Sequence, residues 1–185
     1  MDDALAAALS VFWRKGYEGA SLTDLTKAMG ISRPSLYGAF GNKEQLFRQA
    51  LDLYEVEKMA YVSEALAKPT ARAVAEHLLT KALERQTSVC DPRGCLGVVS
   101  AMQCGDEAQQ IRAEVQARGK AANDALIARF ERARAEGDLP PQVTPEGLAR
   151  LLSAINQGLA MQASAGATAE ELRVLVETAL ECWPT

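Results

Sequence analysis

Side chains that could bond to nucleic acid gather in one stretch of the chain, residues 21–47. Within it, Arg33, Ser35, Tyr37 and Gly38 are predicted to share the exposed face of a short helix. Arginine and hydroxyl groups bond to phosphate oxygens and to acceptor atoms on base edges. We therefore expect this face to enter the major groove of DNA.

Thiols form a second group with possible chemistry. Cys90, Cys95 and Cys104 lie within fifteen residues, around a turn predicted at residues 91–94. Cys95 lies two residues after Arg93 and next to the expected start of a helix, and a basic neighbour and a helix start both activate a cysteine. One hypothesis is therefore a sensor of oxidants or electrophiles, and the alternative is that these cysteines are small buried residues. The chain's four cysteines lack the paired short spacings of a zinc site, so no metal is expected.

Catalysis is a weaker alternative for this chain. The sequence has no glycine-rich phosphate loop and no paired-histidine metal site, and its single histidine, His77, leaves no nucleophile with a plausible histidine base. We therefore expect no catalytic residue and no cofactor, and a helical enzyme ranks below a binding protein. His77 itself is expected either to form a satisfied hydrogen bond on a helix or to contact a ligand.

Two short helices joined by a tight turn are predicted to position the polar face. Ser21 and Asp24 have the spacing of a capping box at a helix start, and Gly30 stands where the turn needs a positive φ. Ser32 caps the next helix, and Pro34 occupies its first turn. The pattern is that of a helix-turn-helix.

Composition indicates an all-α protein. The chain has 185 residues, 48% of them hydrophobic and only 5% aromatic, and alanine is abundant while alternating β-branched runs are scarce. No run approaches the roughly 20 apolar residues of a membrane span. The start, Met1-Asp2-Asp3, lacks the basic region of a signal peptide and any basic arm, so we expect a cytoplasmic protein without membrane contact.

Charge is distributed unevenly along the chain, whose formal net charge is −4. Residues 1–48 carry six basic and five acidic side chains, and the rest of the chain carries 14 basic and 19 acidic ones. The slightly positive net charge of residues 1–48 suits DNA binding, but it differs little from that of the rest of the chain. The prediction of DNA binding therefore depends on the helix-turn-helix motif.

About nine helices are predicted, in a DNA-binding domain over residues 1–47 and a second helical domain over residues 48–185. Phe12 and Trp13 in the first helix are expected to pack in the core. A single long helix over residues 42–68 is expected to connect the two domains. The other ranges predicted to be helical outside the helix-turn-helix are 3–15, 70–89, 96–104, 106–136, 144–166 and 168–183.

The last two predicted helices carry more apolar surface than one core face needs. Pairing with a second copy about a two-fold axis would form a four-helix interface and place two DNA-binding heads side by side. Burial of these faces within one chain is the alternative. The residues expected at the homodimer interface are Leu152, Ile155, Leu159, Leu172, Leu175, Val176 and Ala179.

Several short motifs in residues 1–47 follow one known pattern: Phe12-Trp13, Gly16-Tyr17, Ser21-Leu22, Met29-Gly30-Ile31-Ser32, Leu36-Tyr37, Phe40 and Asn42-Lys43-Glu44-Gln45-Leu46-Phe47. They resemble the DNA-binding domain of the TetR family of bacterial transcriptional regulators. The later helices also resemble that family, whose carboxyl-terminal domain binds a small effector and dimerises through its last two helices.

The resemblance implies roles for individual residues. Tyr37, Lys43 and Thr23 would contact the DNA backbone, while Arg33 and Ser35 would read base edges. Pro34 and Gly38 belong to the same binding face, although many family members carry a larger polar residue at the position of Gly38.

The resemblance further implies a homodimeric repressor that a small-molecule effector releases from double-stranded operator DNA. The thiol sensor named above is the alternative trigger. The candidates for lining an effector pocket are Tyr54, Met59, His77, Met102, Gln103, Phe130, Asn156, Gln157 and Met161.

Overall fold

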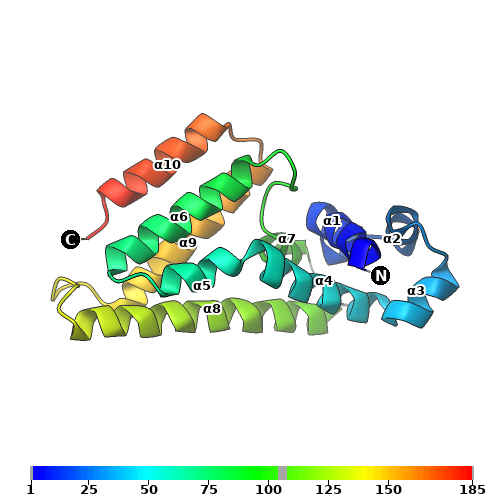
Figure 1. Ribbon diagram of the computed structural model, residues 1–185, viewed down its shortest axis with the longest axis horizontal. Helices are drawn as coiled ribbons and strands as arrows, with labels where there is room; N and C mark the ends of the chain where they lie inside the picture. Colours follow the sequence, from blue (N-terminus) through cyan, green and yellow to red (C-terminus); the bar gives the residue numbers. More distant parts are fainter. Residues whose placement is uncertain (1, 104–107, 185) are drawn as a thin grey trace. The chain divides into compact units, whose positions relative to one another are not determined.

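The computed structural model describes residues 2–103 and 108–184. This part of the chain forms helices and no strand, which confirms the all-α fold (Figure 1). The helices in these ranges are α1 Asp2–Gly19, α2 Leu22–Met29, α3 Arg33–Phe40, α4 Lys43–Lys58, α5 Ala60–Leu66, α6 Ala71–Thr87, α7 Leu96–Gln103, α8 Gln109–Ala135, α9 Pro145–Ser164 and α10 Ala169–Glu181.

The number of helices exceeds the expected nine because one long helix is divided. The continuous helix predicted over residues 42–68 is wrong: α4 ends at Lys58, and α5 begins at Ala60. Met59 between them has φ −117° and ψ 7°, outside the helical range. Neither glycine nor proline marks the break, so the sequence offers no local signal for it.

The first helix also differs from its predicted range. The predicted range is 3–15, and Gly16, the next residue, does leave the helical conformation, with φ 69°. The chain resumes helical geometry beyond it, so α1 extends to Gly19 with a kink. Glycine permits such a kink because it has no Cβ to clash at positive φ.

The helices form two compact units. One combines residues 1–59 with 95–116, and the other combines residues 60–94 with 117–185. The boundary between Gln116 and Ala117 therefore lies inside α8. The expected boundary between residues 47 and 48 separates a DNA-binding domain from a domain for effector binding and dimerisation. That functional division stays a prediction.

Aromatic side chains build the core of the unit that contains residues 1–59. There α1 packs against α2, α4 and α7, and Phe12 and Trp13 are buried. Phe12 meets the ring of Phe47 edge-on with 5.1 Å between centroids, and Trp13 meets Tyr54 in the same way at 4.8 Å. Phe12 and Trp13 are therefore core residues, as their helical spacing predicts.

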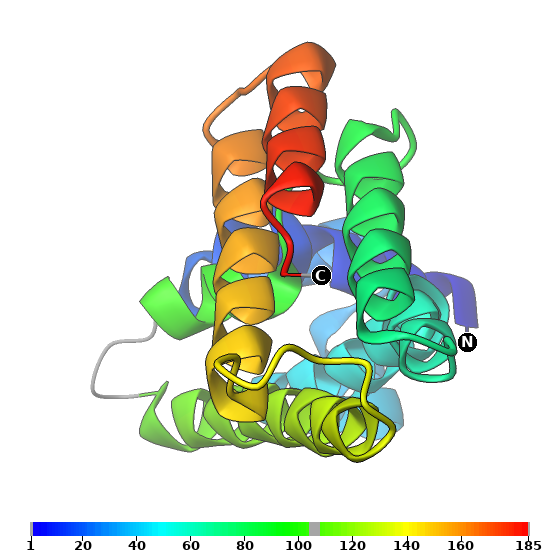
Figure 2. The ribbon, with the colours of Figure 1, turned by 90° about the vertical axis from the view of Figure 1, so that its left-hand side faces the viewer.

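In the unit that contains residues 60–94, α6 packs beside α5, α9 and α10 (Figure 2). The amide of Ala71 at the start of α6 donates to Asp138 Oδ2 at 2.5 Å. Arg129 of α8, only 4% exposed, donates through Nη2 to the carbonyl of Lys68 at 2.7 Å. Burial lowers the pKa of Arg129, because desolvation disfavours its charged form.

Candidate nucleic-acid interface

The amino-terminal end of α2 has a reciprocal cap. Ser21 Oγ accepts from the amide of Asp24 at 3.0 Å, and Asp24 Oδ2 accepts from the amide of Ser21 at 3.1 Å. The ammonium of Lys15 lies 2.8 Å from Asp24 Oδ1. The hydrogen bonds from Lys15 and Ser21 lower the pKa of Asp24 to about 2. The predicted capping box is therefore present, with Lys15 from α1 as an additional partner that local sequence did not reveal.

A glycine turn connects α2 to α3. Gly30 adopts the left-handed conformation at φ 65° and ψ 26°, and its amide donates to the carbonyl of Thr26. The side chain of Ser32 then caps α3 by accepting from the amide of Ser35 at 3.2 Å. These are the local interactions expected of a helix-turn-helix.

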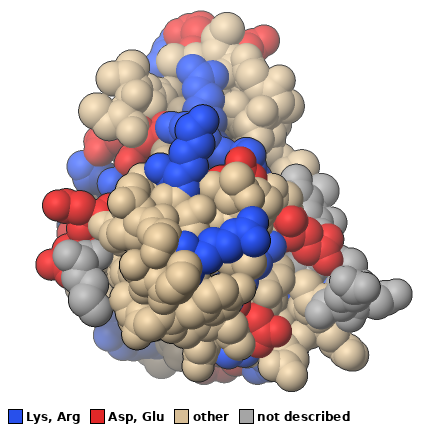
Figure 3. All heavy atoms as spheres, turned by 90° about the vertical axis from the view of Figure 1, so that its right-hand side faces the viewer, with Lys and Arg blue, Asp and Glu red and all other residues tan. Residues whose placement is uncertain are grey.

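The helix α3 uses two side chains as anchors and leaves the rest exposed. Leu36 and Phe40 are its buried residues, and Tyr37 is 48% exposed. Arg33, Pro34, Ser35 and Gly38 are also exposed, so the structure presents this predicted set on one helix. Figure 3 views the molecule from the side where α3 lies in Figure 1, and Lys and Arg side chains occupy the middle of that face.

Two of the predicted DNA contacts bond to each other. Arg33 Nη2 donates to Thr23 Oγ1 at 3.0 Å, across the turn between α3 and α2. Ser35 is also engaged, since its hydroxyl lies 2.9 Å from the hydroxyl of Ser32. Lys27, exposed one helical turn after Thr23, is a further candidate for phosphate contact that our residue set missed. Its i+4 spacing from Thr23 was the available signal.

Lys43 opens α4 behind a second reciprocal cap. Asn42 Oδ1 accepts from the amide of Gln45 at 2.9 Å, and Gln45 Oε1 accepts from the amide of Asn42 at 3.0 Å. The Lys43 ammonium lies 4.5 Å from the centroid of the Tyr17 ring. Desolvation lowers the pKa of Lys43, and the charge of Glu18 opposes that shift. Tyr17 thus orients a predicted phosphate contact, a role that its spacing in the sequence did not indicate.

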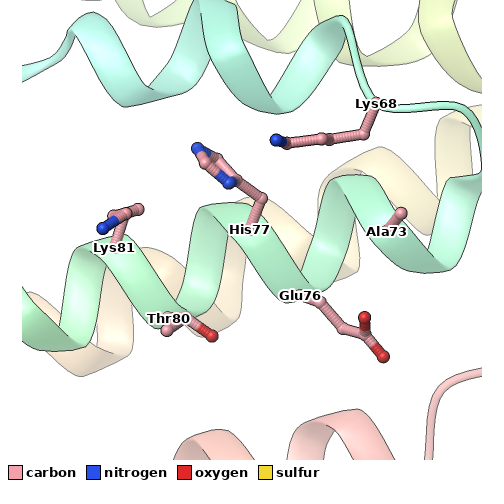
Figure 4. A pocket seen from close by; sticks show the side chains of 6 residues that line it. All are labelled: Lys68, Ala73, Glu76, His77, Thr80 and Lys81. Carbon is pink, nitrogen blue, oxygen red and sulfur yellow. The ribbon is translucent and has the colours of Figure 1, made fainter.

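A hollow of about 350 Å³ lies along α6 in the unit that contains residues 60–94. His77 lines it and places Nε2 3.0 Å from Glu64 Oε2. The side chains of Lys68 and Lys81 point to the same side of α6 as His77, whereas those of Thr80 and Glu76 point away (Figure 4). Of the predicted effector contacts whose side chains the structure describes, His77 lines this hollow.

The other predicted effector contacts are spread over both units. Tyr54 and Phe130 are buried, Met59 and Asn156 are half-buried, and Gln157 and Met161 are exposed. The side chains of Met102 and Gln103, like all of Cys104, lie outside the described residues. Their assignment to an effector pocket stays a prediction.

The predicted turn before Cys95 is held by buried polar groups. Gly94 donates its amide to Gln86 Oε1 at 2.7 Å, and its carbonyl accepts from Gln86 Nε2 at 3.3 Å and from Arg85 Nη1 at 3.1 Å. Cys95 is half-buried, and its sulfur accepts from the hydroxyl of Tyr54 at 3.5 Å. Cys90 is exposed.

The predicted interface residues divide into two groups. Leu152, Leu159, Leu172 and Val176 are buried within their own unit, while Ile155, Leu175 and Ala179 are half-buried. Exposed apolar side chains of α9 and α10 lie beside them, at Leu151, Met161 and Val174. Their assignment to a homodimer interface stays a prediction.

Other kinds of site find no support in the described ranges. There, no three His, Cys, Asp or Glu side chains come close enough together to hold a metal ion. Over the same residues, no helix combines the length and the apolarity that a membrane span requires.

Comparison with known proteins identifies similar chains over nearly the whole length. Residues 4–50 match the family model "Bacterial regulatory proteins, tetR family", and residues 76–179 match "Tetracyclin repressor-like, C-terminal domain". The HTH-type transcriptional repressor ComR of Escherichia coli is 33% identical over 187 residues, covering 99% of this chain and 88% of ComR.

Solved structures give the same result. A cysteine mutant of the TetR family transcriptional regulator CifR, complexed with 26-base-pair double-strand operator DNA, superposes with a TM-score of 0.93. It is 41% identical in sequence, and the match covers 99% of this chain and 96% of that one. A putative TetR transcriptional regulator from Rhodococcus is 39% identical with a TM-score of 0.67, over 98% of this chain and 97% of its own.

Proposed function

The chain belongs to the TetR family of bacterial transcriptional regulators, and from that premise we propose that it is a homodimeric repressor which a small-molecule effector releases from its operator. In this proposal residues 1–47 bind DNA, and residues 48–185 bind the effector and form the dimer. Its relatives are DNA-binding transcriptional regulators, and the chain is likewise a DNA-binding regulator and not an enzyme.

The exposed face of α3 is the observation that carries the proposal. Arg33, Ser35 and Tyr37 leave the helix toward solvent, while Leu36 and Phe40 hold it in the core. A helix held in this way can enter the major groove with its amino-terminal residues against base edges. CifR, which is 41% identical to this chain, has been solved in complex with operator DNA, and this supports DNA as the partner of this chain.

Dimer formation is supported by the exposed apolar side chains of α9 and α10. Leu151 and Val174 are each 49% exposed. Covering them with a second copy removes apolar surface from water and pairs two copies of α3. Two recognition helices about 34 Å apart can occupy successive major grooves, which a single short helix cannot do.

An effector would act by favouring one geometry of the dimer over another. The hollow along α6 is a candidate site, because Lys68 lies there beside Lys81, which is ion-paired with Glu84 at 2.7 Å, and beside His77, which is paired with Glu64. A ligand that binds more tightly to a dimer whose recognition helices no longer match the grooves lowers operator affinity by mass action.

The test is a mobility-shift titration of the protein on DNA from upstream of its own gene, with a scrambled duplex of equal length as control. We expect tight binding to the natural duplex and weak binding to the scrambled one. Equal affinity for both duplexes would contradict a repressor that acts at this site. A thermal-shift screen of small molecules, followed by repeating the titration with each hit, then identifies effectors that release the DNA.

A thiol trigger is the second candidate, favoured by the contact between Tyr54 and Cys95. The half-buried sulfur of Cys95 accepts a hydrogen bond from the Tyr54 hydroxyl at 3.5 Å, and the thiolate form of a cysteine is the nucleophile. Hydrogen peroxide would transfer one oxygen atom to that thiolate, giving a sulfenic acid and hydroxide. Peroxide should then release operator DNA from the wild type but not from Cys95→Ser. If a variant with Cys90, Cys95 and Cys104 all replaced by serine still loses DNA on oxidation, the thiol trigger is wrong.

A further inference from the structure

We infer that Thr23 is a positioning residue for Arg33: its hydroxyl holds the guanidinium in the orientation that reads a base, and so sets operator specificity without reading a base itself. The inference rests on the proposed function, in which Arg33 faces the major groove. It differs from the role expected for Thr23, which was a contact with the DNA backbone alone.

The geometry joins two helices at the site of readout. Thr23 is the second residue of α2, and Arg33 is the first residue of α3. Arg33 Nη2 donates to Thr23 Oγ1 at 3.0 Å, a distance typical of a well-formed hydrogen bond. The long side chain of Arg33 is thereby restrained at its charged end, although both residues are exposed. Restraint before DNA binding lowers the entropy that is lost when the side chain meets a base.

The bond leaves Arg33 able to recognise guanine. A guanidinium has five N–H donors, and four of them form two paired edges, Nε with Nη2 and Nη1 with Nη2. Nη2 carries two hydrogens, one in each edge, so bonding one of them to Thr23 leaves the other edge complete. That edge can donate two parallel hydrogen bonds to O6 and N7 of guanine.

Thr23 also suits the role because its hydroxyl is neutral. Asp24 is next in the chain, but its carboxylate is engaged by Lys15 and by Ser21. In the described part of the chain, Arg33 has no carboxylate within ion-pair distance. Its full positive charge is therefore available to DNA, whereas an acidic anchor would compete with phosphate and guanine for the same donors.

The Thr23 hydroxyl has one further capacity. A hydroxyl both accepts and donates, and here it accepts from Arg33. The nearby hydroxyl of Thr26 already donates to the carbonyl of Leu22 at 2.9 Å. The proton of Thr23 has no acceptor among the described residues, so it is free to donate to a phosphate oxygen. One side chain would then link the DNA backbone to the base-reading group.

The experiment measures discrimination at single base pairs. A duplex is selected by the wild-type protein from a random-sequence pool, and a set of duplexes is made from it with one base pair changed at a time. Fluorescence anisotropy gives the dissociation constants of wild type, Thr23→Val, Thr23→Ser, Arg33→Ala and the double variant Thr23→Val/Arg33→Ala. Valine keeps the shape of threonine without the hydroxyl, and serine restores the hydroxyl.

Discrimination is the ratio of the dissociation constants for the changed and the selected duplex. We expect Thr23→Val to reduce this ratio about tenfold at the base pair where Arg33→Ala also reduces it, because a hydrogen bond to a charged group is lost. Thr23→Ser should retain the wild-type preference, and the double variant should lose no more at that base pair than Arg33→Ala does. Thermal unfolding should show equal midpoints for wild type and Thr23→Val.

Three outcomes separate the possible failures. If the wild type selects no sequence from the pool, the proposed function fails and this inference fails with it. If the wild type discriminates but Thr23→Val weakens binding to every duplex equally, Thr23 is only a backbone contact and the inference alone is overturned. It is overturned as well if the losses from Thr23→Val and Arg33→Ala add fully in the double variant.

Discussion

Asp24 shows how much one side chain contributes to the start of the helix-turn-helix. Its carboxylate closes the cap with Ser21 and receives the ammonium of Lys15 from α1. Because both partners favour the ionised form, they lower its pKa from 3.8 to about 2. A carboxyl whose pKa is lowered on folding stabilises the folded state only where it is ionised.

Removing this carboxylate should give a pH-dependent loss of stability. Asp24→Asn is expected to unfold at a lower temperature than the wild type above about pH 5, where Asp24 is ionised in both the folded and the unfolded chain. The difference should shrink as the pH falls from about 4 towards 2, since the wild-type carboxylate then becomes protonated. Thermal unfolding from pH 7 to pH 2 measures it. A difference that is the same at pH 2 and pH 7 would contradict the role of the charge.

Gly38 is a residue where stability and function are expected to separate. It lies exposed in α3, and an added Cβ would meet no atom within 4 Å. Gly38→Ala should therefore raise the free energy of unfolding by about 0.8–1 kcal/mol through helix propensity. Gly119→Ala in α8, also exposed and uncrowded, is the matched control for stability. Urea unfolding compares the two variants with the wild type.

The same pair of variants tests whether DNA approaches Gly38 closely. A methyl group there should lower operator affinity if the backbone of α3 lies against a base or phosphate, whereas Gly119→Ala should leave affinity unchanged. Affinity that is equal in wild type and Gly38→Ala would place Gly38 away from the DNA.

At the scale of elements, the turn between α6 and Cys95 is held more firmly than an ordinary loop. Gln86 is 1% exposed and forms two hydrogen bonds with Gly94, and Arg93 Nη1 donates to the carbonyl of Ala167 at 2.9 Å. Gly94 itself has φ 97°, and a Cβ there would lie 2.2 Å from the hydroxyl of Ser164. The turn depends on glycine for its conformation and for the space available.

Gly94→Ala should therefore lower the free energy of unfolding by more than backbone strain alone would. The control is Gly137→Ala, because Gly137 also has positive φ, 77°, but has no atom within 4 Å of an added Cβ. The control should lose about 1–2 kcal/mol of unfolding free energy, the cost of the left-handed conformation. Gly94→Ala should lose more, since Ser164 must also shift. Urea unfolding of both variants decides this, and equal losses would show that the crowding at Gly94 is relieved without cost.

The sequence predicts the elements better than their contacts. Helix starts at Ser21, Asn42 and Thr168 were predictable because a cap and its partner lie three residues apart. The break at Met59 was not, since no local residue type requires it. The bond between Thr23 and Arg33 and the ion pair between Arg48 and Glu114 were also not predictable, because they depend on how separate helices pack.

At the scale of the whole molecule, charge and apolar surface point to different partners. The chain has a formal charge of −4, so non-specific attraction to DNA is limited, and affinity depends more on the contacts of α3. The exposed apolar side chains at Leu151 and Val174 have no such electrostatic role. We attribute them to the proposed dimer.

Placing a charge on this surface should separate the two copies. Leu151→Glu is expected to shift the protein from dimer to monomer in light scattering coupled to gel filtration, because a carboxylate would lose its hydration at the interface. Operator affinity should fall at least tenfold at low protein concentration, since each half-site then binds one copy. Val89→Glu is the control, as Val89 is 98% exposed and lies outside α9 and α10. If the Leu151→Glu protein remains dimeric, the dimer interface does not include the surface around Leu151.

The way α3 is anchored has a consequence for the evolution of this regulator. Only Leu36 and Phe40, of its eight residues, are buried, and the residues that cap it, Ser32 and Gly41, lie outside the helix. Substitutions on the six exposed positions therefore leave the core untouched. A gene duplicate could acquire a new operator through a few such changes while keeping its fold, and a designer could exchange the same positions to redirect the protein to a chosen DNA site.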